Sequence, residues 1–228
     1  MLRALIFDFD GVIVDSEPVI MELTRQMATR EGWSLSKEEY YRDYLALDDR
    51  RIVERLFYTH GRPIDVTRRD ALLEWKAAAY RQAIRDGLRP LPGAAEFVKR
   101  CRVAGYPLAI ASGSLREEVE WLLKKLRLRE HFSVLATAED AEYSKPHPGI
   151  YLTALAQLGR LSEFGRHPLH AAECVAVEDA PAGVDAAHAA GIKCVALAHS
   201  RPPVELGQAD WVFSDFDKLN LAALAASC

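Results

Sequence analysis

The sequence predicts an α/β fold, in which a parallel β-sheet forms the core and a smaller all-helical segment is inserted after the first strand. Three observations predict it. Short apolar runs recur along the chain, amphipathic stretches separate them from residue 92 onward, and residues 16–87 show helical periodicity without a buried strand. Strands that alternate with helices are typical of βαβ units, whose strands run parallel.

Six apolar runs are the expected strands, because they are short and rich in Val, Ile, Leu and aromatic residues, as in strands buried on both faces. They are Leu2–Phe7, Pro107–Ala111, Phe132–Ala136, Cys174–Val177, Ile192–Leu197 and Trp211–Phe213. Several amphipathic stretches between them begin at Pro or end at Gly, which are helix start and stop signals. We expect these helices at Gly93–Gly105, Leu115–Leu128, Pro148–Gly159 and Pro181–Gly191.

The inserted segment carries its own helix signals. Ser36 is followed three residues later by Glu39, the spacing of a capping box. Residues 67–86 read as one long helix, with apolar side chains at a spacing of three or four. We therefore expect a core domain formed by residues 1–15 and 88–228, and a helical domain formed by residues 16–87.

Composition excludes several classes of function. Lys and Arg number 29 and Asp and Glu number 33, so the net charge is −4 and there is no basic run. Binding to nucleic acid or to an anionic membrane is therefore not expected. No apolar stretch approaches the ~20 residues of a transmembrane helix, and acidic residues interrupt the apolar N-terminus, unlike a signal peptide. The four cysteines show no paired spacing, as in a reduced, cytoplasmic protein.

The sharpest chemical signal is the pair Asp8 and Asp10, directly after the first apolar run. Open α/β sheets bind ligands at the carboxyl ends of their strands. Two carboxylates this close repel, so they need a cation, a shared proton or full solvation. An ordinary acidic turn is the alternative interpretation, whereas a calcium loop is disfavoured because apolar residues 12–14 follow.

A second acidic pair, Glu178 and Asp179, follows the fourth apolar run. Alone it is typical of the acidic start of a helix. Together with Asp8 and Asp10 it predicts that carboxylates from two strand ends converge on one point. A site built from oxygen ligands suits Mg²⁺ better than zinc.

Two further elements are suited to an anion. Ser112 and Gly113 end the second apolar run before a helix and offer O–H and N–H donors. Lys145 lies beside prolines that stiffen its backbone, which suits a fixed cation aimed at a phosphate. The alternatives are an ordinary helix cap for the first element and a solvated surface lysine for the second.

In order and spacing these elements resemble the motifs of the haloacid dehalogenase-like hydrolase superfamily. Residues 8–17 resemble its first motif, Ser112 its second, Lys145 its third and Glu178-Asp179 its fourth. Residues 177–184 are similar to the subgroup that contains β-phosphoglucomutases and phosphoglycolate or sugar phosphatases. The resemblance covers nearly the whole chain and implies a Rossmann-like core with a helical cap in the insertion.

The resemblance also implies roles for single residues. Asp8 would be a nucleophile that forms an aspartyl-phosphate, and Asp10 a general acid and base whose presence favours phosphoryl transfer over carbon–halogen cleavage. The implied Mg²⁺ ligands are Asp8, Asp10 (through its backbone carbonyl), Glu178 and Asp179, and the implied phosphate-binding residues are Ser112, Gly113 and Lys145. We therefore expect a Mg²⁺-dependent phosphatase for a small phosphorylated metabolite.

Two alternatives remain. The first is a phosphosugar mutase with the same intermediate. Ile20 stands where β-phosphoglucomutases carry a histidine, and Leu115-Arg116 where they carry a lysine, which favours a phosphatase. Lys76 resembles a phosphate-contacting lysine of mutases, or is an exposed helix lysine. The second alternative is a non-catalytic binding protein, which is disfavoured because every motif residue is present.

The helical domain is expected to set specificity. Residues 47–51 are expected to form a loop between two helices, where Arg50 would contact a second anionic group of the substrate. A solvated charged turn is the alternative. Of the seven histidines only His147 lies beside a motif in the sequence, and we assign it no role. Because the cap must move, we expect a monomer.

Overall fold

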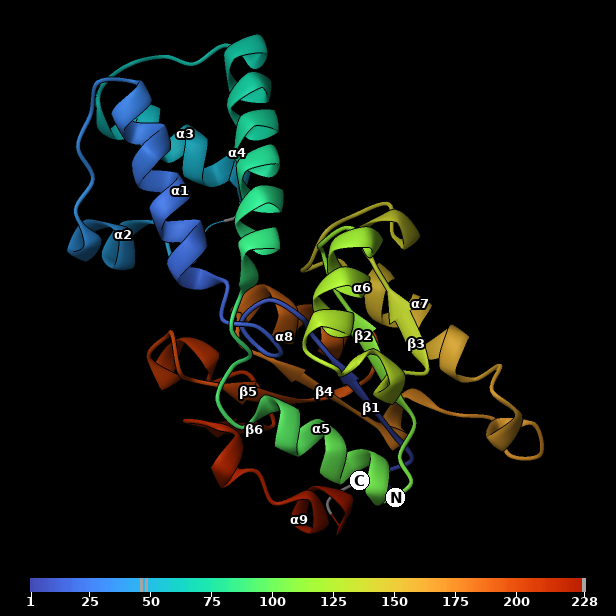
Figure 1. Cartoon of the computed structure of the whole chain (residues 1–228). Helices are drawn as coiled ribbons and strands as arrows, with labels where there is room; N and C mark the ends of the chain where they lie inside the picture. Colours follow the sequence, from blue (N-terminus) through green and yellow to red (C-terminus); the bar gives the residue numbers. More distant parts are fainter. Residues whose placement is uncertain (46, 48, 227–228) are drawn as a thin grey trace. The chain divides into compact units, whose positions relative to one another are not determined.

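The computed structural model describes residues 1–45, 47 and 49–226. The chain forms two compact units. The core unit comprises Met1–Asp15 and the chain from Arg89 onward, and the helical unit comprises Ser16–Leu88. Figure 1 shows the ribbon of both, coloured along the sequence. Each unit is described by itself below.

The core unit contains one sheet of six parallel strands, in the order β3-β2-β1-β4-β5-β6. The strands are β1 (Ala4–Phe7), β2 (Leu108–Ala111), β3 (Val134–Ala136), β4 (Cys174–Glu178), β5 (Lys193–Leu197) and β6 (Trp211–Phe213). Each coincides to within two residues with a predicted apolar run. The predicted α/β fold with a parallel sheet is therefore confirmed.

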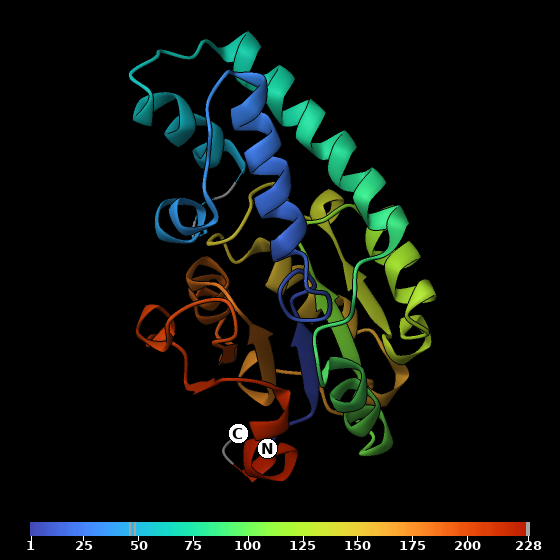
Figure 2. The ribbon, with the colours of Figure 1, turned by 60° about the vertical axis from the view of Figure 1, so that its left-hand side comes forward.

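Four helices of the core unit also follow the prediction, namely α5 (Ala94–Val103), α6 (Arg116–Lys125), α7 (Gly149–Leu158) and α8 (Pro181–Ala189). A further short helix, α9 (Leu221–Ala226), was not predicted. Figure 2 shows their arrangement around the strands. Alternate strand residues face opposite sides of the sheet, so each face needs its own cover.

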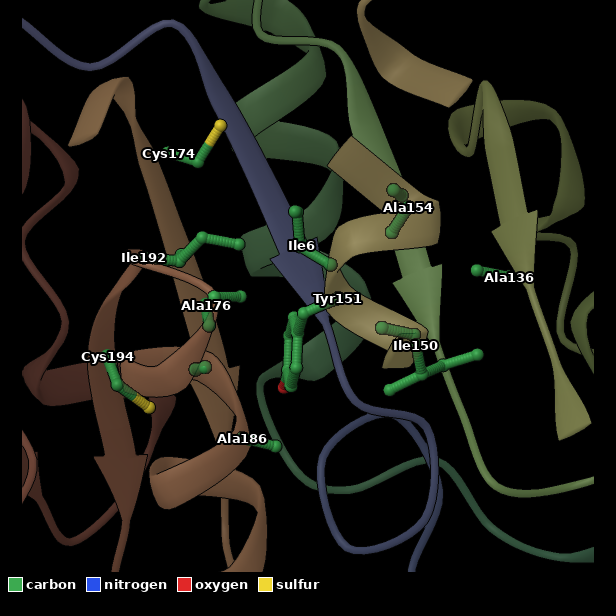
Figure 3. Packing of buried hydrophobic residues seen from close by; sticks show 14 of the residues in the cluster. Ile6, Ala136, Ile150, Tyr151, Ala154, Cys174, Ala176, Ala186, Ile192 and Cys194 are labelled. Atoms are coloured by element: carbon green, nitrogen blue, oxygen red, sulfur yellow. The ribbon is translucent and has the colours of Figure 1, made fainter. Parts of the chain in front are cut away.

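One face of the sheet packs against α7 and α8. Ile6 of β1 and Ala176 of β4 lie on this face, beside Tyr151 of α7 (Figure 3). On the opposite face, the ring of Phe7 packs edge-on against Phe97 of α5, with ring centroids 6.1 Å apart. The core therefore encloses the central strand from both sides.

The strand order determines where the strand ends lie. Phe7, the last residue of β1, is paired with Ile110 of β2 and with Val177 of β4. The segments that follow these three strands consequently emerge at the same edge of the sheet. The order reverses at β1, which is the position where open α/β sheets bind ligands.

The helical unit contains α1 (Glu17–Arg30), α2 (Lys37–Asp43), α3 (Asp49–Thr59) and α4 (Val66–Gly87). The capping box of Ser36 and Glu39 is confirmed, and α4 is the predicted long helix, against which α1 and α3 pack. The buried core of the helical unit includes Met27, Tyr40, Ile52, Leu56 and Leu72. Among the described helices of both units, none is long and apolar enough to cross a membrane.

The expected loop at residues 47–51 is shorter than predicted. Helix α3 begins at Asp49, so Arg50 and Arg51 belong to its first turn. An acidic side chain in the first turn interacts favourably with the helix dipole, which explains the early start. Asp48, in the same expected loop, lies outside the described residues.

The Asp210 carboxylate links β6 to the neighbouring strand. It accepts a hydrogen bond from the Cys194 N–H of β5 at 2.8 Å and forms another with His188 Nε2 at 2.9 Å. Partial burial acts to raise the pKa of Asp210, but these two hydrogen bonds prevail and hold the pKa below its ordinary value. The fold therefore favours the ionised carboxylate.

We expect Asp210→Asn to lower the free energy of unfolding by about 1 kcal/mol near pH 7, because charge-assisted hydrogen bonds become neutral ones. A depressed pKa stabilises the fold above the ordinary value of 3.8, and this contribution is lost as the pH falls through the folded-state pKa. Urea unfolding near pH 7 and near pH 3 checks this, with Asp217→Asn as the control at an exposed carboxylate. Equal losses at both pH values would contradict the assignment.

Candidate active site

Asp8 lies directly after β1, and its backbone N–H donates to the carbonyl oxygen of Val177 at 2.9 Å. Its carboxylate is nearly buried, and Oδ1 accepts a hydrogen bond from Lys145 Nζ at 2.7 Å. Burial raises the pKa of the Asp8 carboxyl to about 7, although Lys145 acts to lower it, and Glu178 adds to the rise. Burial therefore disfavours the ionised form of Asp8, although the Lys145 ammonium lies beside it.

Lys145 joins two strand ends. Its Nζ lies 2.7 Å from Asp8 Oδ1 and 2.6 Å from Glu178 Oε1, so one ammonium bridges the carboxylates that follow β1 and end β4. Burial acts to lower the pKa of Lys145, but the two carboxylates prevail and raise it above its ordinary value. The alternative of a solvated surface lysine is wrong for this residue.

Glu178 is fully buried, and its carboxylate is held by three donors. Oε1 accepts from Lys145 Nζ and from the Tyr151 hydroxyl, each at 2.6 Å, and Oε2 accepts from the Asp179 N–H at 3.2 Å. Burial, followed by the charge of Glu178, raises the pKa of Tyr151 well above its ordinary value, so the phenol remains a donor. Sequence reasoning missed Tyr151, because its spacing in α7 is that of an ordinary core residue.

Two glycines provide the space for the second acidic pair. A Cβ on Gly11, whose φ is +75°, would lie 2.1 Å from Asp179 Oδ2. A Cβ on Gly183 in α8 would lie 2.0 Å from the carboxyl carbon of Glu178. Both distances are far below van der Waals contact, so the two carboxylates occupy their positions only because these residues lack side chains.

Asp8, Glu178 and Asp179 together form an acidic cluster. Each offers a carboxylate oxygen, and these three oxygen atoms lie within 4.8 Å of one another. The cluster holds three carboxyl groups and one ammonium, that of Lys145, so acidic groups outnumber basic ones. Oxygen donors at this spacing, in a buried place, fit a hard divalent cation such as Mg²⁺.

Asp10 lies beside this cluster, and its side chain turns to another strand end. Asp10 Oδ2 accepts a hydrogen bond from the Ser114 hydroxyl at 2.5 Å. We expect Asp10 to bind the metal through its backbone carbonyl. The hydrogen bond between its side chain and Ser114 does not involve that carbonyl. Sequence reasoning did not foresee this contact, which spans 104 residues of the chain.

Ser112 and Gly113 follow β2 and line a pocket of about 200 Å³ together with Lys145. Ser112 is fully buried, and its hydroxyl oxygen accepts from the Ser114 N–H at 3.0 Å. The residues expected to hold a phosphate thus line one cavity, together with Glu142 and others. Lys145 also contacts Asp8 through its ammonium, which links the lining of this cavity to the expected nucleophile.

A histidine that sequence reasoning did not select also lies at this edge. His199 follows β5, and its Nε2 lies 2.6 Å from the carbonyl oxygen of Gly11. The sequence singled out His147 for its place beside a motif. The signal that would have found His199 is its position at the carboxyl end of β5, the strand next to β4.

Arg50 and Lys76, the two remaining predicted residues, belong to the helical unit. Arg50 is exposed in the first turn of α3. Lys76 is only 1% exposed and forms an ion pair with Asp49, so the alternative of an exposed helix lysine is wrong. An ion pair with a residue 27 positions earlier is not visible in the periodicity of one helix.

Comparisons with known proteins agree with this geometry. A model of the haloacid dehalogenase-like hydrolase family matches residues 2–191. Hexitol phosphatase B of Escherichia coli is 32% identical over 196 residues, which cover 86% of this chain and 83% of that protein. Protein CbbY of Rhodobacter capsulatus is 33% identical over 202 residues, covering 85% and 84%.

Solved structures share the fold. CbbY of Rhodobacter sphaeroides, solved in complex with xylulose 1,5-bisphosphate, superimposes with a TM-score of 0.78 at 24% sequence identity. The match covers 98% of this chain and 99% of that one. It supports the Rossmann-like α/β architecture of the core unit.

The close packing of Gly183 against Glu178 predicts the direction in which Gly183→Ala changes the stability of the protein. Ala is more favourable than Gly inside a helix by about 1 kcal/mol, so helix propensity alone predicts that Gly183→Ala stabilises the protein. Because the added Cβ would collide with the Glu178 carboxyl group, we expect a loss of about 1–3 kcal/mol instead.

Urea unfolding of Gly183→Ala, alone and combined with Glu178→Ala, checks this expectation. Against the Glu178→Ala background the same substitution should be neutral or stabilising, because the collision partner is gone. A loss of equal size in both backgrounds would show that Gly183 is needed for some other reason.

Proposed function

The chain belongs to the haloacid dehalogenase-like hydrolase family, and on this premise we propose that it is a Mg²⁺-dependent phosphatase that hydrolyses a small phosphomonoester through an aspartyl-phosphate on Asp8. One observation carries the proposal. Lys145 and three carboxylates from two adjacent strand ends converge at the edge of the sheet, beside a pocket lined by Ser112 and Gly113.

Asp8 is the proposed nucleophile. Its carboxylate attacks phosphorus, the bond to the leaving oxygen breaks, and water then cleaves the aspartyl-phosphate to restore Asp8 and release phosphate. Asp10, two residues further along the same turn, is the proposed acid that protonates the leaving oxygen. In the second step it becomes the base that takes a proton from the attacking water.

Charge stabilisation is expected to contribute much of the rate, because phosphate-monoester hydrolysis is among the slowest uncatalysed reactions. Lys145 and the N–H and O–H groups of Ser112 and Gly113 are the proposed contacts of the phosphoryl oxygens. Because Lys145 is held by two carboxylates, its position is fixed before substrate arrives.

Asp8, the backbone carbonyl of Asp10 and Asp179 are the proposed residues that hold Mg²⁺, with Glu178 either a further ligand or the support of one. The bound ion neutralises negative charge on the transferring phosphoryl group. The donor set supports this assignment, since Asp8, Glu178 and Asp179 each offer a carboxylate oxygen and these oxygen atoms lie within 4.8 Å of one another.

The helical unit is the proposed cap that covers the substrate and excludes water. Arg50 is the proposed contact of a second anionic group, and Lys76 that of the substrate phosphate or a neighbouring group. Relatives named as phosphatases of hexitols, phosphorylated carbohydrates and phosphoglycolate support a phosphorylated sugar, polyol or small acid as the substrate.

Release of inorganic phosphate from a panel of phosphorylated sugars, polyols and small acids tests the function. We expect turnover of at least one compound, and a loss of roughly 10⁴-fold or more in Asp8→Asn, because that variant lacks the nucleophile. The variant should still fold, since Asn keeps the shape of Asp8 and the Lys145 ammonium keeps Glu178 as its charged partner. Asp217→Asn is the control at an exposed carboxylate of the same unit.

Two outcomes would contradict the proposal. Full activity in Asp8→Asn would exclude an aspartyl-phosphate on this residue. Conversion of β-glucose 1-phosphate to glucose 6-phosphate, without release of phosphate, would favour the mutase alternative, in which the same intermediate returns its phosphoryl group to the sugar.

The metal assignment gives a separate prediction. EDTA should abolish turnover and added Mg²⁺ should restore it, while Mg²⁺ alone should raise the melting temperature, because it binds only the folded state. Asp179→Asn should need a higher Mg²⁺ concentration for both effects, whereas Asp217→Asn should not. Undiminished turnover in EDTA would exclude the metal from the reaction.

A further inference from the structure

His199 lies where two parts of the proposed metal site meet. Its Nε2 is 2.6 Å from the carbonyl oxygen of Gly11 and 3.9 Å from Asp179 Oδ2. A carbonyl oxygen only accepts hydrogen bonds, so Nε2 carries the hydrogen and donates it. One neutral tautomer and the imidazolium both supply that hydrogen, so the contact needs no particular charge on the ring.

The hydrogen bond from His199 holds Gly11 in place. Its φ of +75° turns the chain after β1, and its own N–H donates to the carbonyl oxygen of Val14 at 2.8 Å. The Gly11 Cα packs so closely against the Asp179 carboxylate that a Cβ there would overlap Oδ2. Any displacement of this turn therefore changes the space in which Asp179 lies.

The Asp179 carboxylate is consequently confined from several sides. Gly11 lies against it, the Ser200 hydroxyl is 3.5 Å from Oδ2, and the His199 ring stands next to both. Asp8 is three residues before Gly11 on the same turn, so this turn also sets the distance between Asp8 and Asp179.

We propose that His199 is a positioning residue of the metal site. Its hydrogen bond fixes the Gly11 carbonyl and thereby holds the turn after β1 against Asp179, so that Asp8 and Asp179 keep the spacing that a divalent cation requires. The inference rests on the Mg²⁺ site of the proposed function. Groups that orient metal ligands typically change metal affinity about 10–100-fold when they are removed.

Two substitutions of His199 test whether the position of the hydrogen-bond donor matters, or only the presence of a polar side chain there. The amide nitrogen of Gln reaches about as far as His Nε2, whereas that of Asn lies near the place of Nδ1. We expect His199→Asn to raise the Mg²⁺ concentration at half-maximal thermal stabilisation about 10–100-fold. His199→Gln should stay close to wild type, as should His131→Asn, a control histidine of the same unit.

Hydrogen exchange of the metal-free protein gives a readout that needs neither Mg²⁺ nor turnover. The amides of residues 11–14 should exchange faster in His199→Asn than in wild type, because the turn has lost its anchor. In His199→Gln they should exchange at the wild-type rate. Faster exchange confined to this segment would distinguish a local anchor from a general loss of stability.

The outcomes are distinguishable. A wild-type Mg²⁺ response in His199→Asn, or unchanged exchange at residues 11–14, would overturn the role of His199 and leave the proposed function intact. Equal losses in the Asn and Gln variants would also overturn it, since the donor position would then be irrelevant. If the wild-type protein itself fails to respond to Mg²⁺, the proposed metal site is wrong, and the metal-positioning role of His199 falls with it.

Discussion

The bridge from the Lys145 ammonium to the carboxylates of Asp8 and Glu178 is the interaction on which the rest of the site depends. It ties the segment before α7 to the ends of β1 and β4, two neighbouring strands that are far apart in the sequence. Breaking a buried ion pair on one side typically costs about 3–5 kcal/mol, because a charge remains without a partner. The bridge therefore stabilises the fold as well as placing a positive charge at the site. The carboxyl groups of the acidic cluster still outnumber this one ammonium.

The need to accommodate buried carboxylates also explains two glycines at positions that backbone preferences alone would not favour. Gly183 lies inside α8, where Ala is the better helix former, and Gly11 turns the chain at a positive φ. Each leaves the space that a buried carboxylate occupies, Glu178 in the first case and Asp179 in the second. The fold therefore gives up some helix stability at Gly183 and adopts a positive φ at Gly11 to place two acids at the end of β4.

The strands and the main helices of the core were predictable, because apolar runs and amphipathic stretches report burial directly. The acids were predictable as well, since residues at the carboxyl ends of parallel strands meet at one edge. Lys145 lies nine residues beyond the end of β3, and its selection rested on its flanking prolines and on the family resemblance. Tyr151, Ser114 and His199 were not predictable, because each acts through a contact with a residue 27 to 188 positions away that strand order and register create. Nor was the ion pair between Lys76 and Asp49, which depends on how α3 and α4 pack.

The central claim is that the carboxylates at the ends of β1 and β4 surround one divalent ion. Anomalous scattering from crystals grown with Mn²⁺, a cation that prefers the same oxygen ligands, tests it most directly. The account predicts a single strong peak about 2 Å from carboxylate oxygens of both Asp8 and Asp179. A peak at any other place, or no peak at this edge of the sheet with Mn²⁺ in excess, would contradict it.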